Sequence, residues 1–341
     1  MERRIDRIYF ELTTLCNLRC KHCFNFNDNF KVQYLAKEKI RDFYTKVKKK
    51  TSGIVLTGGE PFLHPHILEV IKIFREERVV ITTNGTQFDG SYYEQILKEN
   101  PNVFLQISFD GYSKEVYEEV RGQNTYEKVR KVIDYLSEKG FGAQMGLSMS
   151  ILACNIHEVI DVVKYAEACR MHSIHFPTLI IEGRCADDST ILPDVEELNK
   201  VEDQLLQMAV DSENLHISVN TLNRIAGWAM GGKEQDCLSN ATIKVTVDGS
   251  LMPCPVAWKS TESIGHVDQV TSFEHLEKLV NEIKKEERQE QGCLMCEGSE
   301  ICNQSFCEHC SVRGTNIQEG REYRCKNFIH HINNIKNERK K

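Results

Sequence analysis

Short apolar runs alternate with longer amphipathic segments over the first two-thirds of the chain. An apolar, β-branched run between polar turns predicts a buried strand, and apolar positions that recur every three or four residues predict a helix. The strand pattern occurs at Ile8–Leu12, Ile54–Thr57, Val79–Thr83, Val103–Ser108, Gln144–Ser150 and Ile174–Leu179. The helical pattern occurs between them, at Lys37–Lys48, Pro65–Glu76, Tyr92–Glu99, Tyr126–Lys139 and Ile156–Cys169. Six βα repeats predict an α/β fold with a parallel sheet.

Polar and reactive side chains stand where the predicted strands end. Cys16 follows the first strand, Gly58 the second and Asn84 the third, while Ser108 and Asp110 end the fourth. The carboxyl ends of parallel strands share one edge of the sheet, and ligands bind at that edge. We therefore expect these residues to surround one site.

The alternation ends after Val219, where a cysteine-rich segment begins. This change favours a barrel domain over residues 1–225 and a smaller domain over residues 226–341. In the second part, a segment dense in Glu and Lys predicts a solvated helix near Ser272–Gln291. Phe328–Lys341 predicts a closing amphipathic helix.

The composition fits a cytoplasmic enzyme. The 341 residues are 40% hydrophobic and 27% charged, with a net charge of −7. No apolar stretch approaches the ~20 residues of a membrane span, and the acidic balance argues against nucleic acid as the main partner. No signal peptide precedes the first strand, so the 14 cysteines are expected in a reducing compartment, where they indicate metal or redox chemistry.

Three cysteines follow the first strand with the spacing C-x3-C-x2-C, at Cys16, Cys20 and Cys23. A [4Fe–4S] cluster is normally held by four thiolates, so three cysteines with no fourth nearby predict a cluster with one open iron. An open iron can bind a small molecule, which points to chemistry rather than to scaffolding. A zinc site is the alternative, although zinc favours pairs of C-x2-C. Disulfides are disfavoured because the compartment is expected to be reducing.

After the second strand comes the segment Gly58-Gly59-Glu60-Pro61. The two motifs together resemble those of the radical S-adenosylmethionine (SAM) enzymes, and the predicted topology resembles their partial (β/α)6 barrel. The resemblance implies that the three cysteines bind a [4Fe–4S] cluster and that SAM chelates its open iron. It implies that the Gly-Gly-Glu-Pro segment receives the SAM amino group. In that family, reductive cleavage of SAM yields a 5′-deoxyadenosyl radical, which abstracts hydrogen from a substrate.

Other positions match the SAM contacts of the family. The contacts implied by the resemblance are His22 and Leu179 at the adenine, Asn84 in the pocket lining, Ser108 near the ribose and methionine with Asp110 in the same motif, and Arg121 at the carboxylate. A guanidinium suits the last role because it can bind a carboxylate through two parallel hydrogen bonds. The alternatives are an ordinary βα turn for Asn84, a surface ion pair in a Glu-rich helix for Arg121, and core packing for Leu179.

The cysteines of the last hundred residues resemble the SPASM extension of radical SAM enzymes, which carries two auxiliary [4Fe–4S] clusters. On that pattern, the outer cluster is held by Cys293, Cys296, Cys302 and Cys325, and the inner one by Cys237, Cys254 and Cys307. The family spacing would place a cysteine at Phe306, one position before Cys307, and Cys310 is extra. Cys310 therefore either closes the inner cluster or stands free.

Two further points about the cysteines stay open. Cys293, Cys296, Cys307 and Cys310 would also make a plausible four-cysteine zinc site. Cys154, Cys169 and Cys185 fall outside both patterns, and we expect them to pack as small apolar side chains.

The resemblance also suggests the substrate class. SPASM enzymes mostly modify peptides or proteins, so we expect hydrogen abstraction from a ribosomally made peptide, with a thioether or carbon-linked cross-link as the outcome. Pro255 follows Cys254 where the sulfatase-maturating branch has an aspartate, which disfavours formylglycine formation. The alternatives are a sulfatase-type maturase, a small-molecule radical SAM dehydrogenase and a non-catalytic iron–sulfur electron carrier.

The expected partners follow from the same resemblance. They are the peptide or protein substrate, which either binds the barrel directly or arrives with a separate peptide-carrier protein, and an electron donor such as flavodoxin or ferredoxin. Nucleic acid and membranes are not expected as partners.

Overall fold

The computed structural model describes residues 4–25, 31–48, 51, 53–180, 183–185, 188–219, 240–255, 263–282, 285–287, 305–307, 326–327, 329–334 and 337. The strands are β1 (Arg4–Glu11), β2 (Gly53–Thr57), β3 (Val79–Thr83), β4 (Val103–Ser108), β5 (Met145–Ser148), β6 (Ser173–Phe176), β7 (His216–Val219), β8 (Asn240–Val245), β9 (Ser250–Met252), β10 (Gly265–His266), β11 (Lys285–Glu287) and β12 (Ser305–Cys307). The helices are α1 (Lys37–Val47), α2 (Ile67–Ile73), α3 (Gly90–Glu99), α4 (Lys114–Arg121), α5 (Tyr126–Glu138), α6 (Val159–Ala168), α7 (Val195–Asp211) and α9 (Phe273–Asn281). The predicted α/β class is confirmed.

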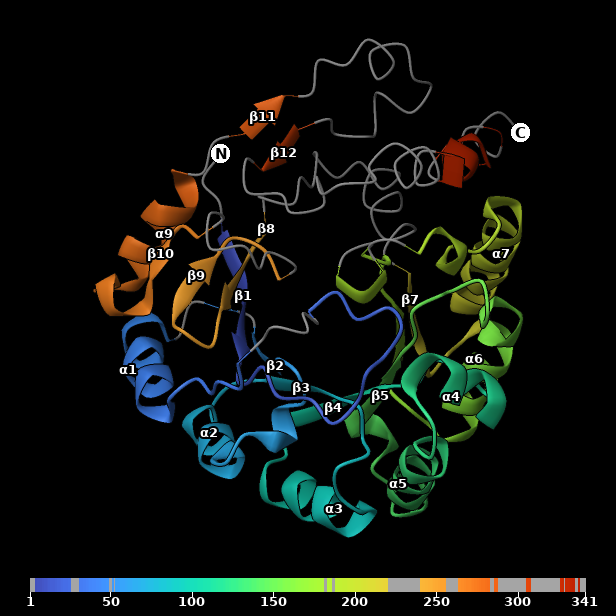
Figure 1. Ribbon diagram of the computed structural model, residues 1–341, viewed down its shortest axis with the longest axis horizontal. Coiled ribbons are helices and arrows are strands. Elements are labelled where there is room, and N and C mark those ends of the chain that lie inside the picture. Colours follow the sequence, from blue (N-terminus) through green and yellow to red (C-terminus); the bar gives the residue numbers. More distant parts are fainter. Residues whose placement is uncertain are drawn as a thin grey trace.

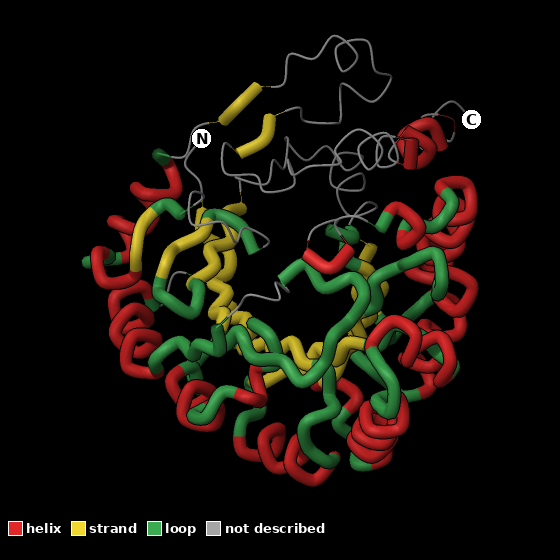
Figure 2. The backbone as a smooth tube through the Cα atoms, viewed as in Figure 1, coloured by secondary structure: helices red, strands yellow, loops and turns green. Residues whose placement is uncertain are grey.

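One curved sheet organises these elements. Its strand order is β10-β9-β8-β1-β2-β3-β4-β5-β6-β7. All pairs from β8 to β7 are parallel, and β9 and β10 add an antiparallel edge beside β8. The helices lie on the convex side of the sheet (Figure 1). The strands therefore form an incomplete ring inside a ring of helices, which is a partial barrel (Figure 2).

The core lies between the sheet and the helices. Every second residue of β4 is buried, and Val103, Leu105 and Ile107 are each at most 1% exposed. On β1, Phe10 packs its ring against Phe43 of α1. Because side chains alternate across a strand, the residues between these apolar ones point into the barrel and stay partly exposed. The inner face is therefore free to carry polar groups.

The predicted strands and helices agree with the observed ones except at some ends. Sequence patterning placed Leu179 at the end of the sixth strand, but β6 ends at Phe176. Pro177 follows, and proline has no N–H to donate to a strand ladder. The fifth strand is also shorter than predicted, because Gly142–Gln144 forms a 3-10 turn before β5.

The helix predicted over Ser272–Gln291 is wrong at Lys285–Glu287, and the prediction for residues 283–284 and 288–291 lies outside the described residues. The observed helix α9 ends at Asn281, and Lys285–Glu287 instead forms an antiparallel pair with Ser305–Cys307. A Glu- and Lys-rich segment buries few apolar groups as a helix, whereas strand pairing supplies hydrogen bonds for its backbone. The predicted closing helix is helical at residues 329–334.

The sheet extends past the barrel predicted from six repeats. β8 pairs in parallel with β1, and the turn from β8 to β9 contains Gly249 at a φ of +94°. A positive φ of this size is costly for residues with a Cβ, so glycine suits this turn. The boundary predicted after residue 225 lies outside the described residues and stays a prediction.

Among the helices that the structure describes, none is both long enough and apolar enough to cross a membrane.

Candidate functional site

The three cysteines predicted to bind a cluster lie in the loop that follows β1. Cys16, Cys20 and Cys23 are free thiols, and Cys20 is buried while the other two are half-buried. Burial raises the pKa of Cys16 to about 11 and also raises the pKa of Cys20 and Cys23. Burial thus disfavours the free thiolates, and a bound metal would stabilise them by replacing the proton.

The Gly-Gly-Glu-Pro segment is joined to the cysteine loop through its backbone. The N–H of Gly59 donates to the carbonyl of Thr13 at 2.7 Å, and the N–H of Glu60 donates to the carbonyl of Leu15 at 2.8 Å. A Cβ on Gly59 would lie 2.2 Å from the Leu15 oxygen. Gly58 has a φ of +138°, and a Cβ there would lie 2.5 Å from the Thr13 oxygen. Both glycines are required for this close approach of two backbones.

The Glu60 carboxylate links the loop after β2 to the loop after β3. It accepts hydrogen bonds from the Phe62 N–H at 3.2 Å, the Thr83 hydroxyl at 2.8 Å and the Asn84 N–H at 2.7 Å. Burial raises the pKa of Glu60 to about 7, against the opposing effect of these donors. That this segment receives the SAM amino group stays a prediction.

Replacing Glu60 by glutamine is expected to remove a pH dependence of stability. The pKa of this carboxyl rises from 4.5 to about 7 on folding, so between these values the folded protein keeps a proton that the unfolded chain has released. The contribution of Glu60 to the free energy of unfolding should thus be largest below pH 4.5 and fall by roughly 3 kcal/mol as the pH rises past 7.

Urea unfolding of the cluster-free protein at about pH 5 and about pH 8 measures this change. The difference between wild type and Glu60→Gln is the relevant quantity, since other groups titrate in both. A pH dependence that is the same in both proteins would contradict the assignment.

Asn84 lies beside the cysteine loop, as the sequence predicted. Its Nδ2 donates to Asn17 Oδ1 at 2.9 Å and lies 4.0 Å from Cys16 Sγ, and its Oδ1 accepts from Thr86. Asn17 Nδ2 in turn donates to the Thr86 hydroxyl at 2.9 Å. Asn17 and Thr86 were not predicted from the sequence. The only signal was that Asn17 lies inside the cysteine motif.

Arg121 and Asp110 form a buried ion pair next to Cys20. Arg121 Nε donates to Asp110 Oδ2 at 2.5 Å, and its Nη1 lies 3.7 Å from Cys20 Sγ. The other Asp110 oxygen accepts the Ser150 N–H at 2.7 Å. Burial opposes the charge of Arg121, but Asp110 and Cys20 outweigh it and raise the pKa of the guanidinium. The alternative of a surface ion pair within the Glu-rich helix is wrong, because Arg121 is buried and pairs with Asp110.

His22 lies against the same pair. Its Nε2 is 3.6 Å from Asp110 Oδ2, and burial lowers the pKa of the imidazole despite the opposing charge of Asp110. Its Nδ1 is buried and has no hydrogen-bond partner among the described residues. A buried polar atom of this kind is normally satisfied by some group, and a bound ligand would satisfy it.

The predicted adenine contact, Leu179, lines a cavity of about 60 Å³. The cavity opens beyond the carboxyl ends of β6 and β7, next to Phe176 and Val219, and it is also lined by Glu202 and Asn327. Leu179 is therefore not only a core-packing residue, since its side chain also lines a cavity. Ser108 is the last residue of β4, is half-buried and pairs with Ser148 of β5.

The auxiliary cysteines lie mostly outside the described residues. Those outside are Cys237, Cys293, Cys296, Cys302, Cys310 and Cys325. Cys254 comes two residues after β9 and is close enough to Tyr9 of β1 to affect its pKa. Cys307 is the last residue of β12. The auxiliary ligand sets stay predictions.

The three cysteines outside both motifs were expected to pack as small apolar side chains. Cys169 and Cys185 are buried, and Cys154 is half-buried against the cluster that contains Cys185.

Residues 10–166, from β1 to α6, match the profile of the Radical SAM superfamily. These residues form a Radical SAM superfamily domain. A domain of this kind works with a [4Fe–4S] cluster and SAM in radical chemistry. The site described above fits both cofactors, since it carries three free thiols on one loop and the His22 nitrogen lacks a partner among the described residues.

Known relatives share this domain and the fold beyond it. GTP 3′,8-cyclase of Synechocystis sp. is 24% identical over 263 residues, which cover 74% of this chain and 79% of that protein. The structure of native anSMEcpe with bound AdoMet has a TM-score of 0.73 at 18% identity and covers 98% of both chains. Streptococcus suis SuiB bound to precursor peptide SuiA has a TM-score of 0.69 at 14% identity, covering 92% of this chain and 73% of that one. At these identities the structural likeness shows the fold.

Proposed function

We propose that this chain is a radical SAM enzyme that abstracts hydrogen from a peptide and forms a cross-link, thioether or carbon-linked, in a ribosomally made peptide. The two solved structures with the same fold support a peptide substrate. SuiB is bound to a precursor peptide, and anSMEcpe has also been solved with AdoMet and the Cp18Cys peptide.

The cavity next to Leu179 is the observation that carries this proposal. Its described lining is mainly apolar and includes Ile151, Leu192 and Val219. The charged side chain in that lining is Glu202, and neither lysine nor arginine is among the described lining residues. An apolar wall with one carboxylate suits a peptide side chain.

The second candidate function is cyclisation of GTP, which is favoured by the sequence relative of that name. A triphosphate is usually held by arginine and lysine side chains. The described lining of the cavity contains no lysine or arginine to hold a triphosphate. The peptide reaction therefore ranks first.

We assign the cluster to Cys16, Cys20 and Cys23. When bound, the cluster supplies the electron that cleaves SAM and thereby generates the radical that takes hydrogen from the substrate. The chain's own part is to hold the loop that carries the cysteines. Hydrogen bonds from Gly59 and Glu60 fix the start of that loop. Arg121 stays charged beside Cys20 and so favours a thiolate there.

The assignments of the SAM contacts rest on position. Asn84, whose Nδ2 lies 4.0 Å from Cys16 Sγ, and His22, which stands beside Cys23 in the chain, are assigned to the SAM pocket, with Ser108 at the end of β4 and Leu179 at the cavity. Asp110 is assigned a positioning role, because the described contacts of its two oxygens are to Arg121, His22 and Ser150.

The remaining features of the proposal concern the rest of the chain and its partners. A barrel domain over residues 1–225 is followed by a SPASM domain over residues 226–341 with two auxiliary [4Fe–4S] clusters. An electron donor such as flavodoxin or ferredoxin and a separate peptide carrier are the proposed protein partners.

The test is a reaction under anaerobic conditions with the reconstituted protein, SAM, a reductant and short peptides encoded beside its gene. We expect 5′-deoxyadenosine together with a peptide that has lost two hydrogen atoms, and fragmentation would locate the cross-link. The same reaction with GTP in place of the peptide is the matched control. Deoxyadenosine formed in step with GTP consumption, and no change in any peptide, would overturn the peptide proposal in favour of the cyclase.

A further inference from the structure

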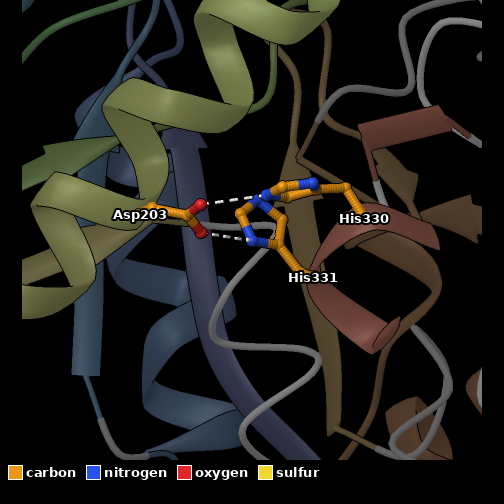
Figure 3. Close-up of side chains that lie close together, drawn as sticks. All are labelled: Asp203, His330 and His331. Carbon is orange, nitrogen blue, oxygen red and sulfur yellow. Dashed lines mark hydrogen bonds and ion pairs between the residues drawn. The ribbon is translucent and has the colours of Figure 1, made fainter. Parts of the chain in front are cut away.

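Two imidazoles and a carboxylate meet between α7 and the helical residues 329–334. The carboxylate of Asp203, on α7, faces both His330 and His331 (Figure 3). Its Oδ2 lies 3.0 Å from His330 Nε2, and its Oδ1 lies 3.3 Å from His331 Nδ1. The three ligand atoms lie within 4.8 Å of one another. This site is separate from the cysteine loop and has no part in the proposed reaction.

We propose that Asp203, His330 and His331 bind one Zn²⁺ ion that fixes the C-terminal segment to α7. Imidazole nitrogen and carboxylate oxygen are ligands that zinc prefers, at about 2.0–2.2 Å. In a tetrahedral site with such bonds, neighbouring ligand atoms are about 3.3 Å apart. Each imidazole nitrogen already stands near that spacing from one carboxylate oxygen, His330 at 3.0 Å from Oδ2 and His331 at 3.3 Å from Oδ1. Rotation of the Asp203 carboxylate, to turn one oxygen toward both nitrogens, would admit the ion.

The groups around His331 support this assignment. Its second nitrogen, Nε2, lies 2.7 Å from Glu202 Oε2, and the same oxygen accepts from Asn327 at 2.7 Å. Both Glu202 and His331 are buried. A ligating histidine commonly donates its other N–H to a carboxylate, which fixes the ring and leaves the remaining nitrogen free for the metal. Glu202 is thus a positioning residue for His331.

The ion can enter from solvent and complete its coordination there. The side chains of Asp203 and His330 are 42% and 33% exposed, whereas that of His331 is 3% exposed. The amide nitrogen of Asn334 lies 3.1 Å from His330 Nε2 and 3.4 Å from Asp203 Oδ1. The amide oxygen of Asn334, after rotation of the amide, or a water molecule would supply the fourth ligand. A site closed in this way is structural, and it holds Asn327 and Glu202 at the wall of the cavity.

The test uses the full chain with its clusters reconstituted, so that the cysteines are already occupied. One equivalent of zinc chloride is added, free metal is removed, and the bound zinc is measured by mass spectrometry and X-ray absorption. We expect close to one zinc per chain with nitrogen and oxygen neighbours at about 2.0–2.1 Å. We expect His330→Asn to weaken zinc binding by more than about 100-fold and Glu202→Gln by about 10- to 100-fold.

His275→Asn is the matched control, because His275 lies on α9 away from the site and should leave zinc binding unchanged. Circular dichroism shows whether each variant folds, and the X-ray absorption spectrum of the wild type decides the ligands independently. Sulfur neighbours at about 2.3 Å would place the zinc on cysteines and overturn the proposal. Equal zinc retention by the wild type and a folded His330→Asn variant would also overturn it.

Discussion

Replacing Cys20 by alanine is expected to abolish SAM cleavage and to lower the iron content by about four atoms per chain. Three cysteines are proposed to hold this cluster, and the buried Cys20 is the one whose sulfur lies 3.7 Å from the Arg121 guanidinium. Two remaining thiolates cannot keep a four-iron cluster whose fourth iron is already open. The measurements are iron content and 5′-deoxyadenosine formation after anaerobic reconstitution.

Cys154→Ala is the matched control for this experiment. Cys154 is a half-buried thiol of the barrel, but it lies outside the motif and packs against apolar side chains. This variant should keep its iron and its activity. SAM cleavage at the wild-type rate by the Cys20 variant would refute the assignment of the cluster to this loop. Some iron retained without cleavage is expected, because the auxiliary clusters are proposed to bind elsewhere.

Replacing Arg121 by methionine is expected to lower the free energy of unfolding by about 3–5 kcal/mol. The Asp110 side chain is 0% exposed and that of Arg121 is 10% exposed, so the change leaves a carboxylate buried without its counter-ion. Removing one partner of such a pair costs far more than breaking an exposed pair. Urea unfolding of the cluster-free protein measures the effect.

A double-mutant cycle separates the ion pair from other effects of this substitution. Adding Asp110→Asn to Arg121→Met removes the uncompensated charge, so the double variant should be more stable than the sum of the single effects implies. Lys21→Ala is the matched control, because its ion pair with Glu119 also ends on helix α4 but both side chains are about half exposed. It should cost less than about 1 kcal/mol. Strictly additive effects of the two buried substitutions would contradict the coupling of Arg121 and Asp110.

The location of the strands and the cysteine motif was predictable because both depend on residues close together in the chain. Val79–Thr83 and Val103–Ser108 were predicted from apolar runs, and they coincide with β3 and β4. Alternation along a strand follows from which face is buried, and this is a local property of the pattern. The resemblance to radical SAM enzymes likewise rested on short motifs.

The prediction failed where an element depends on a distant partner. The segment after Asn281 has the composition of a solvated helix, but Ser305–Cys307 pairs with it and makes a strand. β8 could not be placed beside β1 from the sequence, since more than 200 residues separate these strands along the chain. Strand pairing of this kind depends on the whole fold rather than on the segment's own pattern.

The polar residues of the site were predictable from the sequence, but their contacts were not. The sequence alone was enough to indicate that Asp110 and Glu60 belong near one edge of a sheet, because each lies in a motif that follows a predicted strand, whereas Arg121 was placed at the site only by the family resemblance. It could not show that Arg121 pairs with Asp110, that Glu60 joins two loops, or that His331 meets Asp203. Those pairs depend on where the strands and helices bring side chains in space, and low solvent exposure then makes each pairing strong. The sequence therefore indicates which residues carry the chemistry of the site, whereas the tertiary packing determines which side chains they contact.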